Sequence, residues 1–184
     1  MKPQPMVVPF WSPEEVEAAI NGTLAHLAAG KVLAYPTETV YGFGGAVDER
    51  SVQQLVTLKG RAPGKPFLLL VARSEMITGL GLRLTGYAST LAARFWPGPL
   101  TLVLPGGDKR VPDRLRGPEG GVAVRWTPHK SLARLILAHG DPITSTSAVL
   151  VSGSTVAIGR DDPSRSDAVC DERVTARVRD TLKL

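Results

Sequence analysis

Apolar residues recur along the chain in two periods, one typical of amphipathic helices and one of buried strands. Short apolar runs bounded by glycine, proline or polar residues predict strands over 31–35, 67–72, 100–105, 120–126 and 142–148. Stripes with helical spacing lie between these runs and predict helices over 12–29, 48–59, 86–95 and 127–138. The alternation of the two patterns indicates an α/β chain.

The predicted helices carry recognisable end signals. Ser12 and Glu15 have the spacing of a capping box, with Pro13 at the first helical position and Gly30 after the last turn. Asp48 is the expected cap of the second helix. Several connections resemble hairpins rather than crossover helices, so we expect one twisted mixed sheet with flanking helices.

The composition fits a single folded domain over 1–184. Hydrophobic residues make up 43% of the chain and charged residues 21%, which argues against disorder. Beyond Arg160 the chain alternates arginine with aspartate, and this divergent tail over 160–184 is expected to be a solvated helix or partly disordered.

The charge and cysteine content narrow the classes of partner. A formal net charge of +5 favours anionic partners such as nucleotides or nucleic acid. Cys170 is the only cysteine, which excludes a disulfide framework and a cysteine zinc site and fits a reducing cytosol. No apolar run has the length of a signal peptide or a membrane span, so we expect a cytoplasmic protein without a membrane partner.

Familiar catalytic motifs do not occur. Pro66 follows Gly64 and Lys65 where a Walker loop needs serine or threonine, and Val47 stands where a dinucleotide fingerprint needs its last glycine. Serine hydrolase and zinc hydrolase motifs are missing as well. Any catalysis therefore depends on positioning and charge rather than on a protein nucleophile, and no metal ligands from the protein are expected.

Polar side chains gather where the predicted elements end. Hydroxyls, lysine and arginine together are typical of a site for phosphates and carboxylates. Each residue also has a structural alternative, since threonine after proline closes turns, cations complement helix ends and serine or threonine caps strands. The residues concerned are Thr37, Thr39, Lys59, Arg61, Arg125, Ser145, Thr146 and Ser147.

Five segments of the chain, in this order and spacing, resemble the YrdC-like family of threonylcarbamoyl-AMP synthases. They are YPTETVYGFG, LKGRAPGKPF, FWPGPLTLVLP, VAVRW and PITSTSA, within 30–148. The resemblance implies a twisted α/β sheet with a large basic cavity. It also implies that L-threonine, bicarbonate and ATP, with Mg²⁺, give threonylcarbamoyl-AMP and pyrophosphate for the threonylcarbamoyladenosine modification of tRNA. Contact with tRNA, and transfer of the product to a tRNA-modifying partner protein, are further expectations.

The resemblance also implies roles for individual residues. Thr37, Arg125 and Ser145 would bind threonine, with Arg125 on its carboxylate. The glycines Gly42, Gly44 and Gly45 would let the backbone approach the ligands. The ATP-binding residues would be Lys59, Arg61 and Ser147, with Lys65 and Ser154 as further candidates.

One departure from the family pattern leaves alternatives open. Val149 stands where the family has asparagine, either by substitution or because a residue is inserted nearby. A catalytically weak relative that binds nucleotide or RNA, and a carbamoyl-adenylate enzyme with another carbamoyl donor, are therefore alternatives to the synthase. Pyrophosphate release that depends on threonine and bicarbonate distinguishes them.

Overall fold

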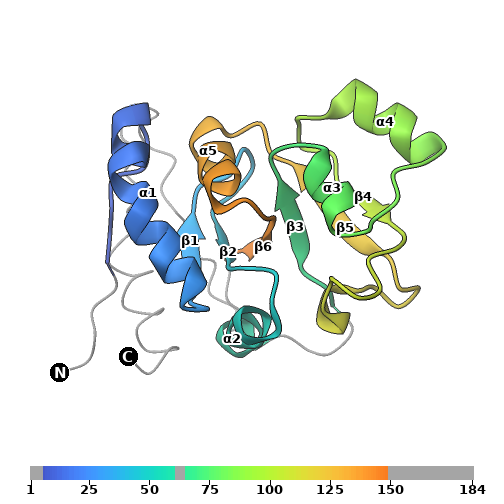
Figure 1. Ribbon diagram of the computed structural model, residues 1–184, viewed down its shortest axis with the longest axis horizontal. Helices are drawn as coiled ribbons and strands as arrows, with labels where there is room; N and C mark the ends of the chain where they lie inside the picture. The colour runs from blue at the N-terminus through green and yellow to red at the C-terminus, as the bar shows by residue number, and fades with distance from the viewer. Residues whose placement is uncertain (1–5, 61–64, 149–184) are drawn as a thin grey trace.

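The computed structural model describes residues 6–60 and 65–148. Its centre is one six-stranded mixed sheet in the order β1-β2-β6-β3-β5-β4, so the predicted fold class is confirmed (Figure 1). Only β3 and β5 run parallel, and the other neighbours are antiparallel. The strands are β1 (Leu33–Tyr35), β2 (Gly42–Gly44), β3 (Leu68–Val71), β4 (Leu102–Leu104), β5 (Val122–Trp126) and β6 (Ile143–Ser147).

Helices flank this sheet, and two of them pack on each other beside it. Helix α5 contacts both β3 and α1, while α4 contacts β4 at the far end of the sheet (Figure 1). Among the described residues, no helix is both long and apolar enough to cross a membrane. The helices are α1 (Pro13–Ala28), α2 (Glu49–Lys59), α3 (Glu75–Gly79), α4 (Tyr87–Phe95), α5 (Lys130–His139) and the 3₁₀ turn η1 (Asp113–Leu115).

The helix ends follow the local signals in the sequence. The Ser12 and Glu15 side chains form the reciprocal capping box, and Asp48 accepts a 2.8 Å hydrogen bond from the Ser51 amide. The prediction that a helix opens at Thr127 and Pro128 is wrong, because α5 begins at Lys130. The Thr127 hydroxyl is bonded to a distant carboxylate, and His129 caps the helix instead.

The strands divide their side chains between two faces of the sheet. Leu69, Val71, Val122 and Val124 are fully buried in the core. Their neighbours along the strands lie on the opposite face, because side chains alternate along a strand. Register places Leu68 beside Ser145 and Leu70 beside Arg125 on that second face. The second face therefore brings a hydroxyl and a guanidinium together across three strands.

The glycine-rich segment after β1 forms β2, a central strand with all three residues buried, and not a turn. Tyr35 explains the glycines, because its hydroxyl donates a 2.7 Å hydrogen bond to the Thr144 carbonyl on β6, two strands away. A Cβ on Gly44 would lie 1.7 Å from that carbonyl oxygen, and one on Gly42 would lie 3.2 Å from the Tyr35 ring. Gly44 is therefore required for the close packing of β2 against Tyr35 and β6. Gly42 also lines the cavity described below.

Several sequence predictions concern residues outside the described ranges. These are the ATP-site residue Arg61, the further candidate Ser154, the departure at Val149 and the tail over 160–184.

Candidate functional site

A cavity of about 350 Å³ opens on the second face of the sheet. Gly42 of β2 and side chains from β3, β5 and β6 form its floor, and the turn between β1 and β2 forms its wall. Four of the predicted site residues, Thr37, Arg125, Ser145 and Ser147, line it. The remaining lining residues are Thr39, Val40, Tyr41, Gly42, Pro66, Leu68, Leu70, Ala123 and Thr146.

Arg125 is held at two of its three nitrogens. Nε donates a 3.0 Å hydrogen bond to the Thr101 hydroxyl, and Nη1 donates to Glu38 Oε1 at 2.9 Å and to the Thr39 hydroxyl at 3.4 Å. No residue in the described ranges accepts a hydrogen bond from Nη2. The side chain is 19% exposed and lines the cavity, so Nη2 is available to donate a hydrogen bond to a ligand.

Glu38 connects the turn to the end of β5. Its side chain is 13% exposed, and its second oxygen, Oε2, accepts a 2.9 Å hydrogen bond from the buried hydroxyl of Thr127. The carboxylate therefore contacts residues 125 and 127 with one oxygen each. An ion pair this far removed from water is costly to break on one side, because the remaining charge is left unpaired.

Thr37 closes its own turn. Its hydroxyl donates to the Val40 carbonyl at 2.6 Å and accepts from the amides of Thr39 and Val40 at 3.2 Å each. This arrangement uses the hydroxyl proton and both acceptor positions. Thr37 thus fulfils the structural alternative given for it above, and it meets the cavity as part of a fixed turn.

Ser145 is buried beside Tyr35 at the floor of the cavity. Burial raises the pKa of the Tyr35 hydroxyl far above its usual value, with the charge of Glu38 adding to the rise, while a hydrogen bond with Ser145 opposes it. Tyr35 therefore stays protonated and keeps donating to the Thr144 carbonyl. Tyr35 and Ser145 are thus buried neighbours at the floor of the cavity.

Lys59 lies at the end of α2, where Gly60 adopts a left-handed conformation with φ of 56°. Its side chain is buried, and Nζ donates a 2.8 Å hydrogen bond to the Ser147 carbonyl at the end of β6. Lys59 and Ser147, both predicted for ATP, are thus direct neighbours. Lys65 is exposed and does not line the cavity, although the adjacent Pro66 does.

Three residues of this network are not among the predicted site residues. Glu38 lies within the YPTETVYGFG segment, Thr127 begins the predicted helix over 127–138, and Thr101 lies in the predicted strand over 100–105. The antiparallel register of β4 and β5 pairs Leu102 with Val124, which brings Thr101 beside Arg125. Once β4 and β5 are known to pair, this register indicates that Thr101 contacts Arg125. No comparable strand pairing indicates the contact between Glu38 and Arg125.

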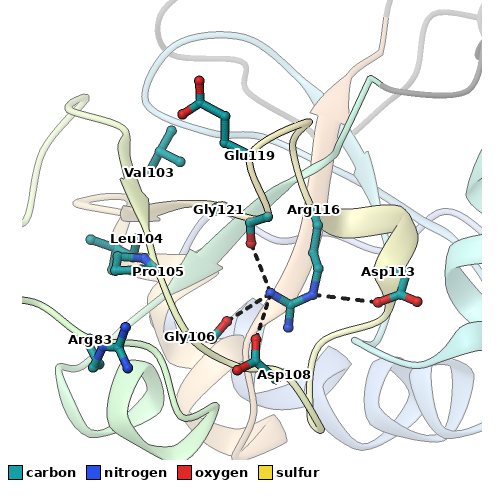
Figure 2. A pocket seen from close by; sticks show the side chains of 11 residues that line it. Arg83, Val103, Leu104, Pro105, Gly106, Asp108, Asp113, Arg116, Glu119 and Gly121 are labelled. Atoms are coloured by element: carbon teal, nitrogen blue, oxygen red, sulfur yellow. Dashed lines mark hydrogen bonds and ion pairs between the residues drawn. The ribbon is translucent and has the colours of Figure 1, made fainter.

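A larger cavity of about 610 Å³ lies elsewhere and contains none of the predicted site residues (Figure 2). Its guanidinium, from Arg116, donates 2.9 Å hydrogen bonds to the carbonyls of Gly106 and Gly120 and lies 3.6–3.7 Å from the carboxylates of Asp108 and Asp113. Arg116 Nη2 has no partner in the described ranges, but it is shielded from solvent and so does not face the cavity. Arg116 therefore holds loops together, and we place the candidate site in the smaller cavity.

The smaller cavity combines an oriented guanidinium with serine and threonine hydroxyls. Such a set binds a small carboxylate and hydroxyl-bearing ligand, because guanidinium and carboxylate form charge-assisted hydrogen bonds. The buried Lys59 beside Ser147 adds a positive charge at the end of β6. In the part of the chain that the structure describes, no group of three or more histidine, cysteine, aspartate or glutamate residues could hold a metal ion.

Comparisons with known proteins agree with the segments quoted above. The sequence model of the Sua5_yciO_yrdC family, described as telomere recombination, matches residues 25–167. Threonylcarbamoyl-AMP synthase of Thiobacillus denitrificans is 38% identical over 169 residues, which cover 90% of this chain and 84% of that protein. The enzyme of the same name from Pyrococcus abyssi is 42% identical over 120 residues, which cover 65% of this chain but only 35% of that protein.

Solved structures show the same relationship. The crystal structure of P. abyssi Sua5 complexed with L-threonine is 40% identical, with a TM-score of 0.66, and the match covers 72% of this chain and 39% of that one. E. coli YciO has a TM-score of 0.68 at 24% identity, with 84% of this chain and 73% of that one covered, and supports the fold alone. Because the family model matches residues 25–167 and two relatives are 38% and 42% identical, the chain belongs to the Sua5/YciO/YrdC family.

Proposed function

We propose that the protein is a threonylcarbamoyl-AMP synthase, which forms threonylcarbamoyl-AMP and pyrophosphate from L-threonine, bicarbonate and ATP. The observation that carries the proposal is the similarity to the T. denitrificans synthase, which extends over 90% of this chain. The oriented Arg125 at the cavity supports it, because Nη2 is not used by Glu38 or Thr101 and the carboxylate of a free amino acid is a suitable acceptor for it.

In this proposal Arg125 Nη2 binds the threonine carboxylate, and Ser145 contacts the same substrate. Thr37 contributes through the turn that it closes, which forms the wall of the threonine site. The P. abyssi Sua5 that holds L-threonine is 40% identical to this chain and supports the choice of amino acid.

Lys59, Arg61 and Ser147 are proposed to bind ATP, with Lys65 and Ser154 as further candidates. The direct contact between Lys59 and the Ser147 carbonyl supports grouping these two. Mg²⁺ would enter with the ATP phosphates, which are its usual ligands in nucleotide sites. The proposed chemistry needs no protein nucleophile: the threonine amine attacks the bicarbonate carbon with loss of water, and the carbamate oxygen then attacks the α-phosphorus. The protein's part is alignment and charge stabilisation as pyrophosphate leaves.

The product would serve the threonylcarbamoyladenosine modification of tRNA, delivered through a partner protein. Contact with RNA is a separate proposal, for which the net charge of +5 is the only support. The cytoplasmic location expected from the sequence likewise remains a prediction. The large basic cavity that the family resemblance implies remains a prediction as well.

Pyrophosphate release by the purified protein tests the proposal. We expect release from ATP with Mg²⁺ only when both L-threonine and bicarbonate are present, because all the reactants must be aligned before charge develops at phosphorus. L-Serine and L-valine in place of threonine are matched controls, since each lacks one substituent of the threonine side chain. Equal release with and without threonine would contradict the proposal, and ATP binding without release would favour the catalytically weak relative.

A further inference from the structure

We infer that Glu38 is a positioning residue, which holds the Arg125 guanidinium so that Nη2 faces the cavity. This inference rests on the proposed function, in which Arg125 binds the threonine carboxylate. Glu38 itself need not contact the substrate, because its two carboxylate oxygens are already engaged by the Arg125 Nη1 and Thr127 Oγ1 groups, at 2.9 Å each.

The first support is the rigidity of Glu38. The two contacts fix the carboxylate plane, because each oxygen is bonded to a different residue near the end of β5. Thr127 is itself fixed, since it is 1% exposed and its hydroxyl accepts a 3.2 Å hydrogen bond from the His129 amide. Glu38 is therefore a rigid acceptor, which is what a group that orients another side chain requires.

The second support is the choice of Arg125 atoms that are used. Glu38 binds Nη1, and Thr101 on the other side binds Nε. Two contacts on different nitrogens of a planar group set its orientation, so the direction of Nη2 is determined. Without Glu38, the long arginine side chain gains conformers, and the substrate carboxylate must select the productive one.

The third support is the electrostatic balance of the pair. Arg125 is 19% and Glu38 is 13% exposed, so both charges are largely removed from water and compensate each other before substrate arrives. If Glu38 merely neutralised Arg125, its removal would strengthen binding of a substrate carboxylate. If Glu38 orients Arg125, its removal weakens that binding, so the sign of the effect separates the two roles.

A double-mutant cycle in steady-state kinetics tests the inference. Glu38→Gln keeps the size of the side chain and removes its charge, and we expect it to lower kcat/KM for threonine about tenfold through KM, with the KM for ATP changed less than about twofold. In the background of Arg125→Gln, the same change should alter kcat/KM less than about twofold, because the group it acts through is gone. Glu119→Gln, at an exposed carboxylate that lines the larger cavity, is the matched control and should change nothing.

Side-chain NMR of arginine provides a readout that does not need turnover. We expect separate Nη resonances for Arg125 in the wild type, assigned by their loss in Arg125→Gln, and averaging of these resonances in Glu38→Gln. Glu38→Asp, whose shorter side chain cannot keep both contacts, should give an intermediate result.

Each remaining outcome is decisive. Unchanged Arg125 resonances in Glu38→Gln, additive effects in the cycle, or tighter threonine binding in Glu38→Gln would overturn the inference. Averaged resonances together with no calorimetric binding of threonine by any variant or the wild type would instead overturn the proposed function, and with it the role of Glu38 toward threonine.

Discussion

The hydroxyl of Thr37 shows how one side chain can belong to both a turn and a ligand site. All of its hydrogen-bonding capacity is used within four residues, at 2.6–3.2 Å. A ligand could bind this hydroxyl only by displacing one of these contacts. We therefore expect Thr37 to act mainly by keeping the turn, and with it Glu38, in place.

Thr37→Val tests this expectation. Removal of the hydroxyl should lower the free energy of unfolding by about 0.5–1.5 kcal/mol, the usual net value of a hydrogen bond, and should also raise the KM for threonine. Thr37→Ser keeps the hydroxyl and should restore both values. Thermal unfolding and steady-state kinetics measure the two effects, and a higher KM in Thr37→Val with unchanged stability would show that the hydroxyl acts on the ligand directly.

The sequence predicts contacts between residues that are close in the chain more accurately than contacts between residues that are far apart in it. Ser12, Glu15 and Asp48 were predicted correctly because a helix cap depends on residues three positions apart. Glu38 was missed because its partners lie 87 and 89 residues further along the chain. The spacing of residues along the sequence does not indicate contacts over such a distance, whereas the strand over 120–126, which carries Arg125, was predicted from its local apolar run.

At the scale of elements, β2 shows most clearly what the sequence pattern could not supply. Its glycines resemble a flexible turn, but their requirement arises from the Tyr35 side chain and from the Thr144 carbonyl, which lies 109 residues from Tyr35. The strand is therefore defined by the neighbours that pack against it and not by its own propensity.

Gly44→Ala should be clearly destabilising. The added Cβ would lie 1.7 Å from the Thr144 carbonyl oxygen, so β2 or β6 must shift. Overpacking of this kind costs about 1–3 kcal/mol, which lowers the melting temperature of a chain this size by roughly 2–12 °C. Gly79→Ala is the matched control, because nothing lies within 4 Å of its added Cβ and alanine favours helix. Equal melting temperatures for the two variants would contradict this account of β2.

The start of α5 should make stability depend on pH. His129 accepts a hydrogen bond from the Leu132 amide through Nδ1, and burial lowers its pKa from the ordinary value of 6.5, with the charge of Glu38 opposing the shift. The unfolded chain therefore takes up a proton at higher pH than the folded chain does. The stabilisation by neutral His129 is complete above about pH 6.5 and is lost as the pH falls through the lower folded pKa.

His129→Asn should weaken this dependence, because asparagine caps helices without titrating. Melting temperatures measured between pH 7.5 and pH 5 test this expectation. As the pH falls over this range, the wild type should lose more stability than the variant. The pKa of His139, at the other end of α5, is also lowered by burial, so His139→Gln is the comparison that separates the two histidines. An unchanged slope in His129→Asn would rule out the cap as its source.

At the scale of the whole molecule, β6 joins two halves of the sheet. It pairs with β2 on one side and with β3 on the other, and the Thr144 amide donates a 2.8 Å hydrogen bond to the Gly45 carbonyl. The same strand supplies Ser145 and Ser147 to the cavity. Loss of β6 would therefore separate the halves and remove part of the site at the same time.

Native-state hydrogen exchange should reflect this position. We expect the amides of Thr144 and Ser145 to exchange only by global unfolding, whereas amides of the edge strands β1 and β4 exchange through smaller openings. The edge strands in the same sample are the internal comparison. Exchange of β6 as fast as the edges would show that it opens locally.

The central position of β6 also determines when the sheet can be completed during synthesis of the chain. In the native order, the strands before β6 form two groups, β1 with β2 and β3 with β5 and β4. Until β6 is present, each group has an open edge on the side where β6 will pair. Both edges stay available for wrong pairing until residues 143–147 emerge from the ribosome. We therefore expect a nascent chain halted before β6 to bind chaperones more readily than the completed chain does, because its sheet edges are still open.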